Sequence, residues 1–506
     1  MLGVLINRCR RPFIRFPRLF CIFVLLAQLP LALADTATNT SGGSDGVTGG
    51  DVSVPEQPDK LSTYWSDVQL SGYLKNESAY RYRAPRSITK IRNIAYLNAK
   101  YPYGPHLKFN FSGWAYYDLA YNLFDYNTIA ARFQRNSSEP LAFLVTLPQE
   151  KDASGAEIRE LYADMYLGNL DARIGKQFVV WGVLEGVRIT DEINPMDFRE
   201  LILPDLLDYR IPLWMAKFDY YRPEASYQLL WIPDIRFHKP APPGSEWELL
   251  QEVPGTRYPQ SFNYKNSEFG YKVSTNLWDT ELTFSYFYTW DDFPVIFRHV
   301  LLNQSIDPQF YPTYTRLSMY GTTFVKQLSS YILKGEMAYV TGKYFAVANA
   351  DENHDGWLDN NGEFKRNHIR WGLGMDFNWQ GADISPSIVQ WIILDYDPAI
   401  IQDQYDTGIN LFLRKEYPDS STIFSLLAIY LVNLEEVYLK PKWTFRITDQ
   451  FQIGAGVDMF FGKSSQLGVS GVLNSAGGVD VPEQRAQFIG NFHDNDQVFL
   501  EFKYSF

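Results

Sequence analysis

The sequence predicts an all-β membrane protein: a transmembrane, antiparallel, up-and-down β-barrel of about 18 strands, with 16 as the alternative, behind a cleavable N-terminal signal peptide. Three observations predict this fold. Apolar and polar residues alternate over segments as long as one spanning strand, and aromatic residues make up 16% of the chain. The chain also begins with a basic and then apolar stretch and ends in an amphipathic strand that stops on Phe506.

Residues 1–34 have the features of a secretory signal peptide. Five arginines and no acid lie in the first 18 residues, and the apolar run 19–33 leads to Ala32-Leu33-Ala34, a cleavage motif before Asp35. This run is too short for a comfortable transmembrane helix. Arg10-Arg11 resembles a twin-arginine signal, but the strongly apolar run after it favours the general secretion route.

Cleavage there changes both the thiol chemistry and the charge of the protein. Cys9 and Cys21 are the two cysteines, so the mature chain has no disulfide, thiol nucleophile or cysteine-ligated metal. Loss of the five arginines leaves 41 basic against 58 acidic residues, a net charge of −17. Nucleic acid is therefore not an expected partner.

Residues 35–60 are predicted to be a flexible periplasmic leader. They contain Gly42-Gly43, Gly49-Gly50 and repeated Ser, Thr and Asp, with almost no apolar content to bury. Residues 61–506 then form a single barrel domain. No segment after the signal peptide approaches the roughly 18 continuous apolar residues that a spanning helix needs. A soluble array of β-sandwiches is the alternative, but it would require domain linkers that the sequence lacks.

The strands are predicted from a period of two. In 369–379 the residues Ile, Trp, Leu, Met, Phe and Trp interleave with Arg, Gly, Gly, Asp and Asn, and 107–112, 281–288 and 451–461 alternate in the same way. Eleven residues is about the length of one tilted spanning strand. The excess of aromatic residues, 34 Tyr, 35 Phe and 13 Trp, fits the aromatic girdles at the two membrane interfaces.

Short and long connections alternate between the strands. This asymmetry is typical of outer-membrane barrels, which have short periplasmic turns and longer external loops. The segments near 170–178 and 405–415 are weak strands, which leaves the count between 18 and 16. The short connections are predicted at 101–106, 168–171, 222–226, 276–280, 327–330, 380–383, 416–420 and 448–450, and the long ones at 120–156, 179–212, 233–266, 291–313, 343–366 and 463–494.

The last strand predicts the location of the protein. Leu500, Phe502, Tyr504 and Phe506 share one face, whereas Glu501, Lys503 and Ser505 share the other. Such a terminal strand resembles the signal by which Gram-negative outer-membrane proteins are recognised for insertion. We therefore expect the bacterial outer membrane as the location, with membrane lipid and, through Phe506, the barrel-assembly machinery as partners.

A barrel of this size can enclose an aqueous lumen. The side chains predicted to line it are polar and mixed in sign, which does not imply strong ion selectivity. Most of them are expected to be solvated or paired across strands. They are Lys108, Asp164, Arg173, Lys272, Glu281, Lys334, Glu336, Arg370, Asp376, Asp458, Glu501 and Lys503.

The long connection 179–212 is unusually rich in Leu, Ile and Trp. Exposed apolar surface usually finds a partner, so we expect this loop to fold inward and to narrow the lumen, with its charges pairing with wall charges. A loop that merely caps the barrel mouth is the alternative. The residues expected at the constriction are Trp181, Arg188, Asp191, Asn194, Asp197, Arg199, Asp205 and Arg210.

The same stretch carries a family resemblance. Gly175-Lys176-Gln177, Trp181-Gly182 and Asn194-Pro195-Met196-Asp197 resemble the signature of an uncharacterised family of porin-like outer-membrane proteins, a domain of unknown function. Members are often encoded beside lipid-exporting permeases. The resemblance implies a barrel that handles apolar cargo. Lys176 stands where the family pattern leads us to expect arginine.

A second predicted site is a calcium loop at 351–359. Oxygen-bearing residues occupy positions 1, 3, 5 and 9 of the spacing, and Gly356 stands at position 6, where the chain must turn sharply. Position 12 is glycine, with Glu363 one residue later. The expected cofactor is Ca²⁺, and an acidic turn that binds nothing is the alternative. The expected ligands are Asp351, Asn353, Asp355, Trp357 through its carbonyl, Asp359 and Glu363.

Enzyme function is not expected. The sequence contains no G-x-S-x-G, H-E-x-x-H or P-loop motif, and its six histidines fall in predicted turns, loops or strand ends. The predicted function is passive, substrate-selective passage of a small or amphipathic solute. The alternative is a plugged structural or partner-binding barrel without free conductance.

Overall fold

The computed structural model describes residues 67–84, 86–123, 154–204, 208–241, 246–247, 255–299, 309–347, 359–463 and 489–506. These residues all belong to one compact unit, Thr63–Phe506. The predicted signal peptide and periplasmic leader lie outside the described residues.

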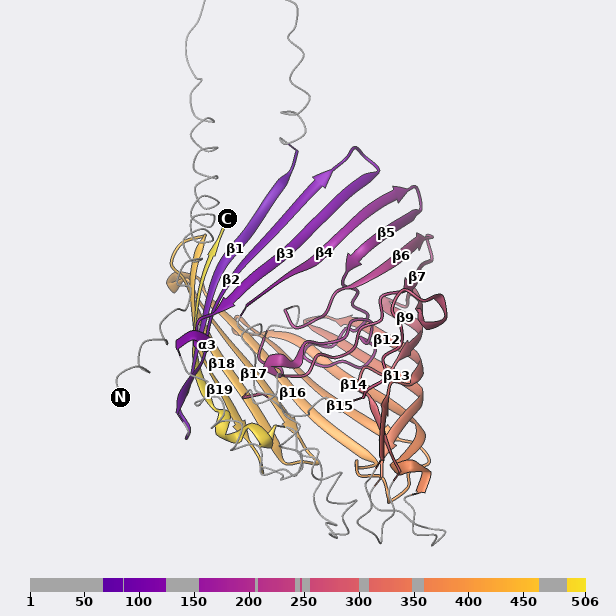
Figure 1. Ribbon diagram of the computed structural model, residues 1–506. Helices are drawn as coiled ribbons and strands as arrows, with labels where there is room; N and C mark the ends of the chain where they lie inside the picture. The colour runs from indigo at the N-terminus through magenta and orange to yellow at the C-terminus, as the bar shows by residue number, and fades with distance from the viewer. Residues whose placement is uncertain are drawn as a thin grey trace, which may run out of the picture. The chain divides into compact units, whose positions relative to one another are not determined.

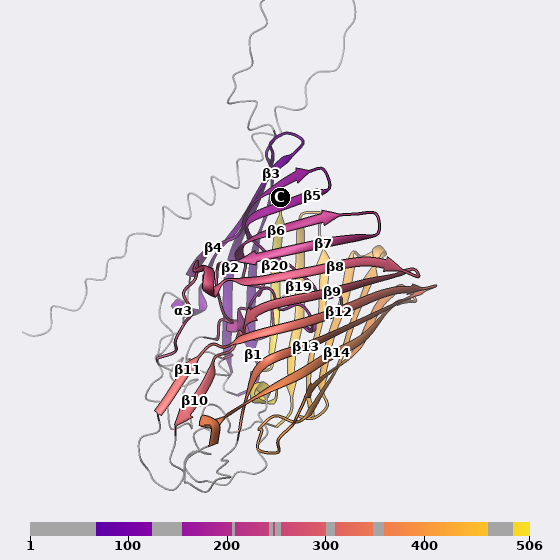
Figure 2. The same cartoon turned by 90° about the vertical axis from the view of Figure 1, so that its right-hand side faces the viewer.

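Eighteen strands form one closed antiparallel ring, which confirms the predicted fold class and the higher of the two strand counts. The ring strands follow one another in chain order, with β12 next to β9 and β20 next to β1 (Figures 1 and 2). No helix among the described residues is long and apolar enough to cross a membrane. The ring strands are β1 (Gln69–Arg81), β2 (Ser87–Pro102), β3 (Leu107–Asp118), β4 (Ser154–Leu167), β5 (Leu170–Gln177), β6 (Leu213–Tyr221), β7 (Ala225–Ile232), β8 (Glu268–Leu277), β9 (Thr280–Trp290), β12 (Arg316–Leu328), β13 (Tyr331–Ala346), β14 (Glu363–Trp379), β15 (Ala382–Ile393), β16 (Tyr405–Tyr417), β17 (Thr422–Leu431), β18 (Glu436–Arg446), β19 (Phe451–Phe461) and β20 (Gln497–Ser505).

The ring closes where the last strand meets the first. β20 pairs with β1 from Tyr73 opposite Ser505 to Arg81 opposite Gln497. The closure continues at the chain end, where the N–H of Gly72 donates to the carbonyl of Phe506 at 2.9 Å and the N–H of Phe506 donates back at 3.0 Å. A Cβ on Gly72 would lie 2.8 Å from the Phe506 ring, so glycine leaves room for the terminal aromatic side chain. Closure removes the exposed sheet edge that would otherwise pair with other chains.

The connections follow the prediction on one side of the ring and only partly on the other. All eight predicted short connections lie between consecutive strands, and the two weak segments are β5 and β16. On the opposite side the connections 82–86, 394–404 and 432–435 are also short, which the prediction did not include. The 291–313 connection contains a separate hairpin, β10 (Val295–His299) with β11 (Gln309–Thr313).

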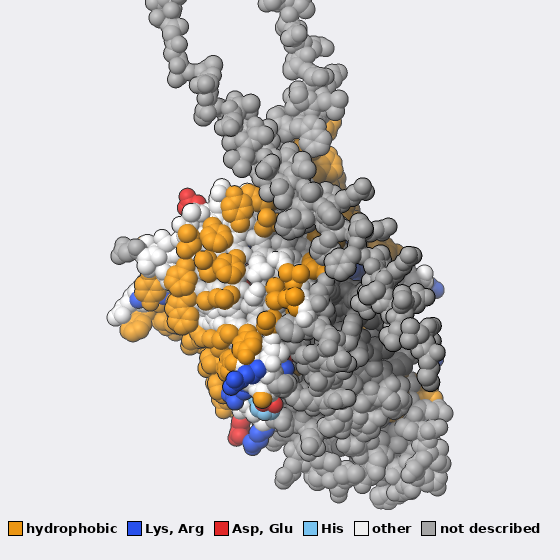
Figure 3. Space-filling view, turned by 60° about the vertical axis from the view of Figure 1, so that its left-hand side comes forward, with side chains coloured by type: hydrophobic (Ala, Val, Ile, Leu, Met, Phe, Trp, Pro, Cys, Tyr) orange, Lys and Arg blue, Asp and Glu red, His pale blue; other side chains and the backbone are white. Residues whose placement is uncertain are grey.

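The outer face of the ring is apolar and aromatic. On β20, Leu500 is 47% exposed and Phe502 is 39% exposed, whereas Gln497 and Phe499 on the other face are buried. On β14, Leu373 and Trp379 are exposed in the same alternating way. Figure 3 shows hydrophobic side chains spread over one part of this surface, with charged side chains at its lower edge. The period of two therefore separates the outside of the barrel from its inside.

The inside of the ring differs from the predicted polar wall. Several predicted wall charges do pair, including Arg173 with Asp164 at 2.6 Å and Lys442 with Glu501 at 2.6 Å. Among the described residues, however, three clusters of buried apolar side chains also form, and the largest joins inward side chains of β6, β7, β9, β12, β13 and β15 to residues 179–193. Alternation predicts which side chains face inward, but it does not show which of them contact water and which are covered by another part of the chain.

Candidate functional site: the inner segment of the barrel

The connection between β5 and β6, residues 178–212, is here called the inner segment; residues 205–207 lie outside the described part of the chain. Its first half packs against the inner wall. Trp181 is 3% exposed, its indole N–H donates to Gln228 Oε1 at 2.6 Å, and its ring meets Phe287 edge-on at 6.0 Å between centroids. Exposure of this apolar stretch to water would cost free energy, and strands on the inner side of the ring cover it.

One wall carboxylate holds this half in place. Glu336 on β13 is 4% exposed and accepts four hydrogen bonds from the inner segment. The donors are the N–H groups of Val183, Leu184 and Thr190 and the hydroxyl of Thr190, at 2.5, 2.6, 3.1 and 2.8 Å. Hydrogen bonds to a charged acceptor are stronger than neutral ones. A buried carboxylate with all these donors is therefore a fixed attachment point for the first half of the inner segment.

Glycines in the wall make room for the side chains of the inner segment. A Cβ on Gly372 of β14 would lie 2.6 Å from Ile189 Cδ1 and 2.7 Å from Leu184 Cδ1. A Cβ on Gly270 of β8 would lie 2.8 Å from the Trp181 ring. At these distances a Cβ would force the side chains of the inner segment to shift, so glycine here allows the inner segment to pack closely on the wall.

The charges of the inner segment pair differently from the prediction. Asp191 pairs with Arg210, both fully buried, and Asp197 pairs with Arg199 at 2.6 Å. Arg188 donates to the carbonyls of Asp191 and Asn194 at 2.7 and 2.8 Å. The prediction that these charges pair with wall charges was therefore wrong. They fold the inner segment onto itself, and Arg199 also donates to the Tyr116 hydroxyl on β3 at 2.9 Å.

The other predicted residues have local roles. Asn194 is buried and accepts from the N–H of Val179 at 2.9 Å, while its amide donates to the carbonyl of Ile211 at 2.9 Å. This one side chain therefore ties the two ends of the inner segment together. Asp205 lies outside the described residues.

Glutamates that the prediction left out make the contacts between the inner segment and wall cations. Glu192 pairs with Arg370 of β14 at 3.0 Å. Burial alone would raise the pKa of Glu192, but Arg370, Arg188 and Lys343 hold this pKa below its ordinary value. Glu200, in the short 3₁₀ helix η3 (Phe198–Glu200), pairs with Lys90 of β2 at 2.6 Å and with Arg92.

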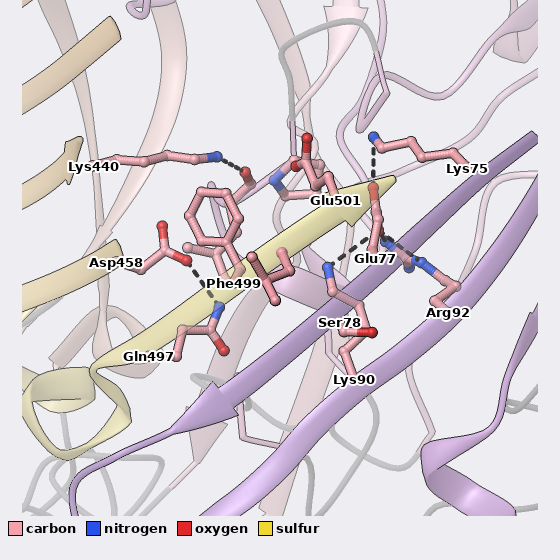
Figure 4. A pocket seen from close by; sticks show the side chains of 13 residues that line it. Lys75, Glu77, Ser78, Lys90, Arg92, Lys440, Asp458, Gln497, Phe499 and Glu501 are labelled. Carbon is pink, nitrogen blue, oxygen red and sulfur yellow. Dashed lines mark hydrogen bonds and ion pairs between the residues drawn. The ribbon is translucent and has the colours of Figure 1, made fainter. Parts of the chain in front are cut away.

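The second half of the inner segment meets the opposite wall around Glu200. Lys440 of β18 donates to the carbonyl of Leu203, and Leu201 and Leu203 pack with Tyr438 and Phe460 in a buried cluster. Figure 4 shows the neighbouring wall charges, in which Glu77 lies between Lys75 and Arg92. The attachment here combines ion pairs with apolar packing.

A buried histidine supports the middle of the inner segment. His238 Nδ1 accepts from the N–H of Met196 at 2.9 Å, and its ring lies edge-on to Phe198 and Phe293. Burial, with Arg188, Lys343 and Arg370 nearby, holds the pKa of His238 well below its ordinary value. Burial also raises the pKa of Asp292 well above its ordinary value, so the 3.8 Å approach of Asp292 to His238 is not an ion pair at neutral pH. With Nδ1 occupied, this imidazole serves as a structural acceptor.

The predicted calcium ligands are mostly beyond what the structure describes. Residues 351–358 lie outside the described part, so only Asp359 and Glu363 can be placed. Asp359 begins the short 3₁₀ turn that precedes β14, and Glu363 is the first residue of β14. Arg298 donates to the carbonyls of Val347 and Gly362 at 2.7 and 2.9 Å, which ties the two ends of this loop together. Among the described residues no group of three or more His, Cys, Asp or Glu is arranged to hold a metal ion.

Comparison with protein families matches residues 89–365 to a family described as a protein of unknown function, DUF1302. The match covers more than half of the 506 residues. The chain belongs to the DUF1302 family. The resemblance predicted from Gly175 to Asp197 is thereby confirmed, since these residues lie within the matched stretch of the DUF1302 chain.

None of the curated proteins compared with the DUF1302 chain is similar to it. Among solved structures it is similar to OccAB3 of Acinetobacter baumannii, with a TM-score of 0.46, 9% identity and coverage of 87% of this chain and 99% of the other. It is also similar to the outer membrane protein OpdK of Pseudomonas aeruginosa, with the same four values. OccK9 (OpdG) of Pseudomonas aeruginosa has a TM-score of 0.48 at 9% identity, with 87% and 99% covered.

Proposed function

We propose that this DUF1302 chain is a porin-like channel of the bacterial outer membrane. It lets a small or amphipathic solute pass passively and selectively, and the inner segment is its constriction. One observation carries the proposal. The inner segment is attached to β13 through Glu336 and to β2 through Lys90, and these strands are nine steps apart either way round the ring of 18. A segment fixed to opposite walls crosses the interior and limits what can pass.

The outer surface supports a membrane location. Exposed aromatic and aliphatic side chains recur along strands that lie far apart in the ring, such as Tyr227 on β7, Trp379 on β14 and Leu500 on β20. An apolar band flanked by aromatic residues is what lipid contact requires of a barrel. Phe506 at the chain end is then the residue that the barrel-assembly machinery would bind, and its deletion is expected to reduce the yield of inserted barrel in outer-membrane fractions.

Deletion of residues 184–208 tests the channel and its constriction together. The measurement is single-channel conductance of the refolded full-length mature chain in planar bilayers, with folding checked by heat-modifiable gel mobility. The deletion should raise the conductance, because it removes both wall attachments. An unchanged conductance would rule out the constriction.

A plugged structural or partner-binding barrel is the second candidate. The apolar clusters around Trp181 and Leu203 support it, because they fill parts of the interior near both walls. Folded protein that conducts neither as the full chain nor after the deletion would favour this candidate over a channel.

We also propose that the loop around residues 351–359 binds Ca²⁺ and stiffens an external connection. The proposal rests on the spacing of Asp351, Asn353, Asp355 and Asp359 and on millimolar external calcium, at which even a weak site fills. Terbium luminescence sensitised by Trp357 tests it. The emission should appear in the full chain, fall on addition of calcium and be lost in Asp355→Asn; its absence in the folded full chain would contradict the site.

No catalytic role is proposed. His238, the buried histidine that contacts the inner segment from the connection between β7 and β8, is neutral and hydrogen bonded at Nδ1, and an activated nucleophile would need such a base to be free.

A further inference from the structure

The two attachments of the inner segment differ in chemistry. At β13 the bonds run from main-chain N–H groups to one buried carboxylate and are surrounded by apolar packing. At β2 they run between charged side chains, and Glu200, Lys90 and Arg92 remain 16%, 18% and 20% exposed. Ion pairs within reach of water are weaker than buried, charge-assisted bonds to the main chain. The β2 attachment is therefore the end that another ion can replace.

The wall at this attachment gathers three cations around one carboxylate. Lys75, Lys90 and Arg92 surround Glu77, with closest approaches of 2.6, 3.2 and 2.7 Å. Asp118 is the second wall carboxylate near Arg92, and its Oδ1 accepts from the N–H groups of Ile91 and Ala120 at 3.0 Å. Lys75 also lies 4.0 Å from Asp208 of the inner segment, whereas Lys90 and Arg92 share Glu77 and can each pair with one further carboxylate. In this structure Glu200 supplies that carboxylate.

The space beside the cations is too small for a solute in this structure. The cavity lined by Lys75, Lys90 and Arg92 has a volume of about 30 Å³, which is room for a water molecule and not for an organic ion (Figure 4). Glu200 is the carboxylate that pairs with both Lys90 and Arg92, so a solute carboxylate that binds the same two cations would take its position. The remaining lining includes Leu203 and Phe499, which offer apolar contact to whatever the carboxylate carries.

We propose that Lys90 and Arg92 form a binding site for the carboxylate of an amphipathic solute, that Glu200 occupies this site in the closed state, and that the solute displaces Glu200 and releases the second half of the inner segment. The inference rests on the proposed channel function and names its substrate class. Both groups remain ionised throughout, so the step is an exchange of one carboxylate for another at the same cations. The attachment at Glu336 keeps the first half in place during the exchange.

Conductance with two matched probes tests the site. Octanoate carries the carboxylate and an apolar chain, whereas octanamide carries the same chain without charge. At constant ionic strength, octanoate should raise the conductance of the full mature chain and octanamide should not. Glu200→Gln should conduct at the raised level without octanoate, because loss of the charge-assisted bonds to Lys90 and Arg92 raises the released population by at least about tenfold. Lys90→Gln with Arg92→Gln should also be raised and should not respond to octanoate.

Glu416→Gln is the matched control. Glu416 also pairs with an arginine, Arg446 at 2.6 Å, but at a short turn away from the inner segment. This variant should behave like the unchanged chain. Equal effects of octanoate and octanamide, or a steady conductance that octanoate leaves unchanged, would overturn the carboxylate site while leaving the channel intact. Absence of conductance in every variant, including the 184–208 deletion, would instead overturn the channel itself.

Discussion

Single residues of the wall show how the interior is built. Gly372 lies in an alternating strand, and the pattern predicts only that it faces inward. Its lack of a side chain matters because Ile189 and Leu184 fill the space where a Cβ would be. Glu336 belongs to the same strand pair and accepts four hydrogen bonds from the inner segment. At these two residues the inner face is complementary to the inner segment, in shape at Gly372 and in hydrogen bonding at Glu336.

Gly372→Ala is expected to loosen the inner segment without harming the barrel. The added methyl group would overlap two buried side chains, and overpacking of this kind costs about 1–3 kcal/mol. Hydrogen exchange at the amides of Val183, Leu184 and Thr190 should become faster. Gly408→Ala is the control, because the nearest neighbours of Gly408 are side chains of strands next to it in the ring. Unchanged exchange in Gly372→Ala would contradict the close packing at this position.

The Glu200 attachment should respond to pH only in the acid range. Burial would raise the pKa of Glu200, but Arg92 and Lys90 outweigh burial and hold this pKa below its ordinary value of 4.5. A lowered pKa means that the ion pairs are complete above the ordinary value and are lost as the pH falls through the lower one. Conductance should therefore be constant from pH 8 to 5 and should rise only below this range.

The control for this pH profile is Glu200→Gln, which should conduct at the raised level throughout pH 8 to 5. A rise near pH 6 in the unchanged chain would mean that another group controls the segment.

At the scale of elements, strands were predicted well and the long connection only in part. The alternation on β20 predicts which side chains are outside, because a strand exposes its two faces strictly in turn. The inner segment has no such period. Its composition indicates that it must be covered, but Asp191 could pair with Arg210 or with a wall cation on the same sequence evidence. Local folding of the inner segment decides between these partners.

Leu500→Arg on β20 is expected to destabilise the inserted barrel by about 2–4 kcal/mol, the cost of a cation at the centre of the lipid-facing surface. Thr444→Arg on β18 is the control, since Thr444 shares the inner face with Lys442. Urea unfolding in lipid vesicles measures both variants. Equal stability of the two would contradict the assignment of the outer face.

At the scale of the whole molecule, the ring gives the inner segment two attachment points on opposite walls. β2 and β13 are separated by half the circumference, so neither the turn geometry nor any local contact relates Lys90 to Glu336. The inner segment links them, and each attachment limits the freedom of the other. Stability at one wall should therefore depend on the state of the other wall.

Combining Glu336→Gln with Glu200→Gln should have a larger effect than the sum of the single changes. Each single variant keeps one attachment, and each lost charge-assisted bond costs about 1.5–3 kcal/mol. With both lost, the segment has lost charge-assisted bonds at each end of its crossing, although contacts such as Glu192 with Arg370 and Arg199 with Tyr116 remain. Hydrogen exchange of the inner segment in the four forms gives the coupling. Strict additivity would indicate that the two halves move independently.

The sequence by itself determined the closed barrel, its strand positions and its apolar outer face, because these follow from a period of two and from turns that are local in the chain. It also singled out residues 179–212 as a segment that must be covered. Only the tertiary structure decided which carboxylates attach the inner segment to the wall. Glu192, Glu200 and Glu336 are ordinary glutamates in the sequence, and their partners lie 178, 108 to 110 and 146 to 153 residues away. Ring closure alone brings such distant residues together.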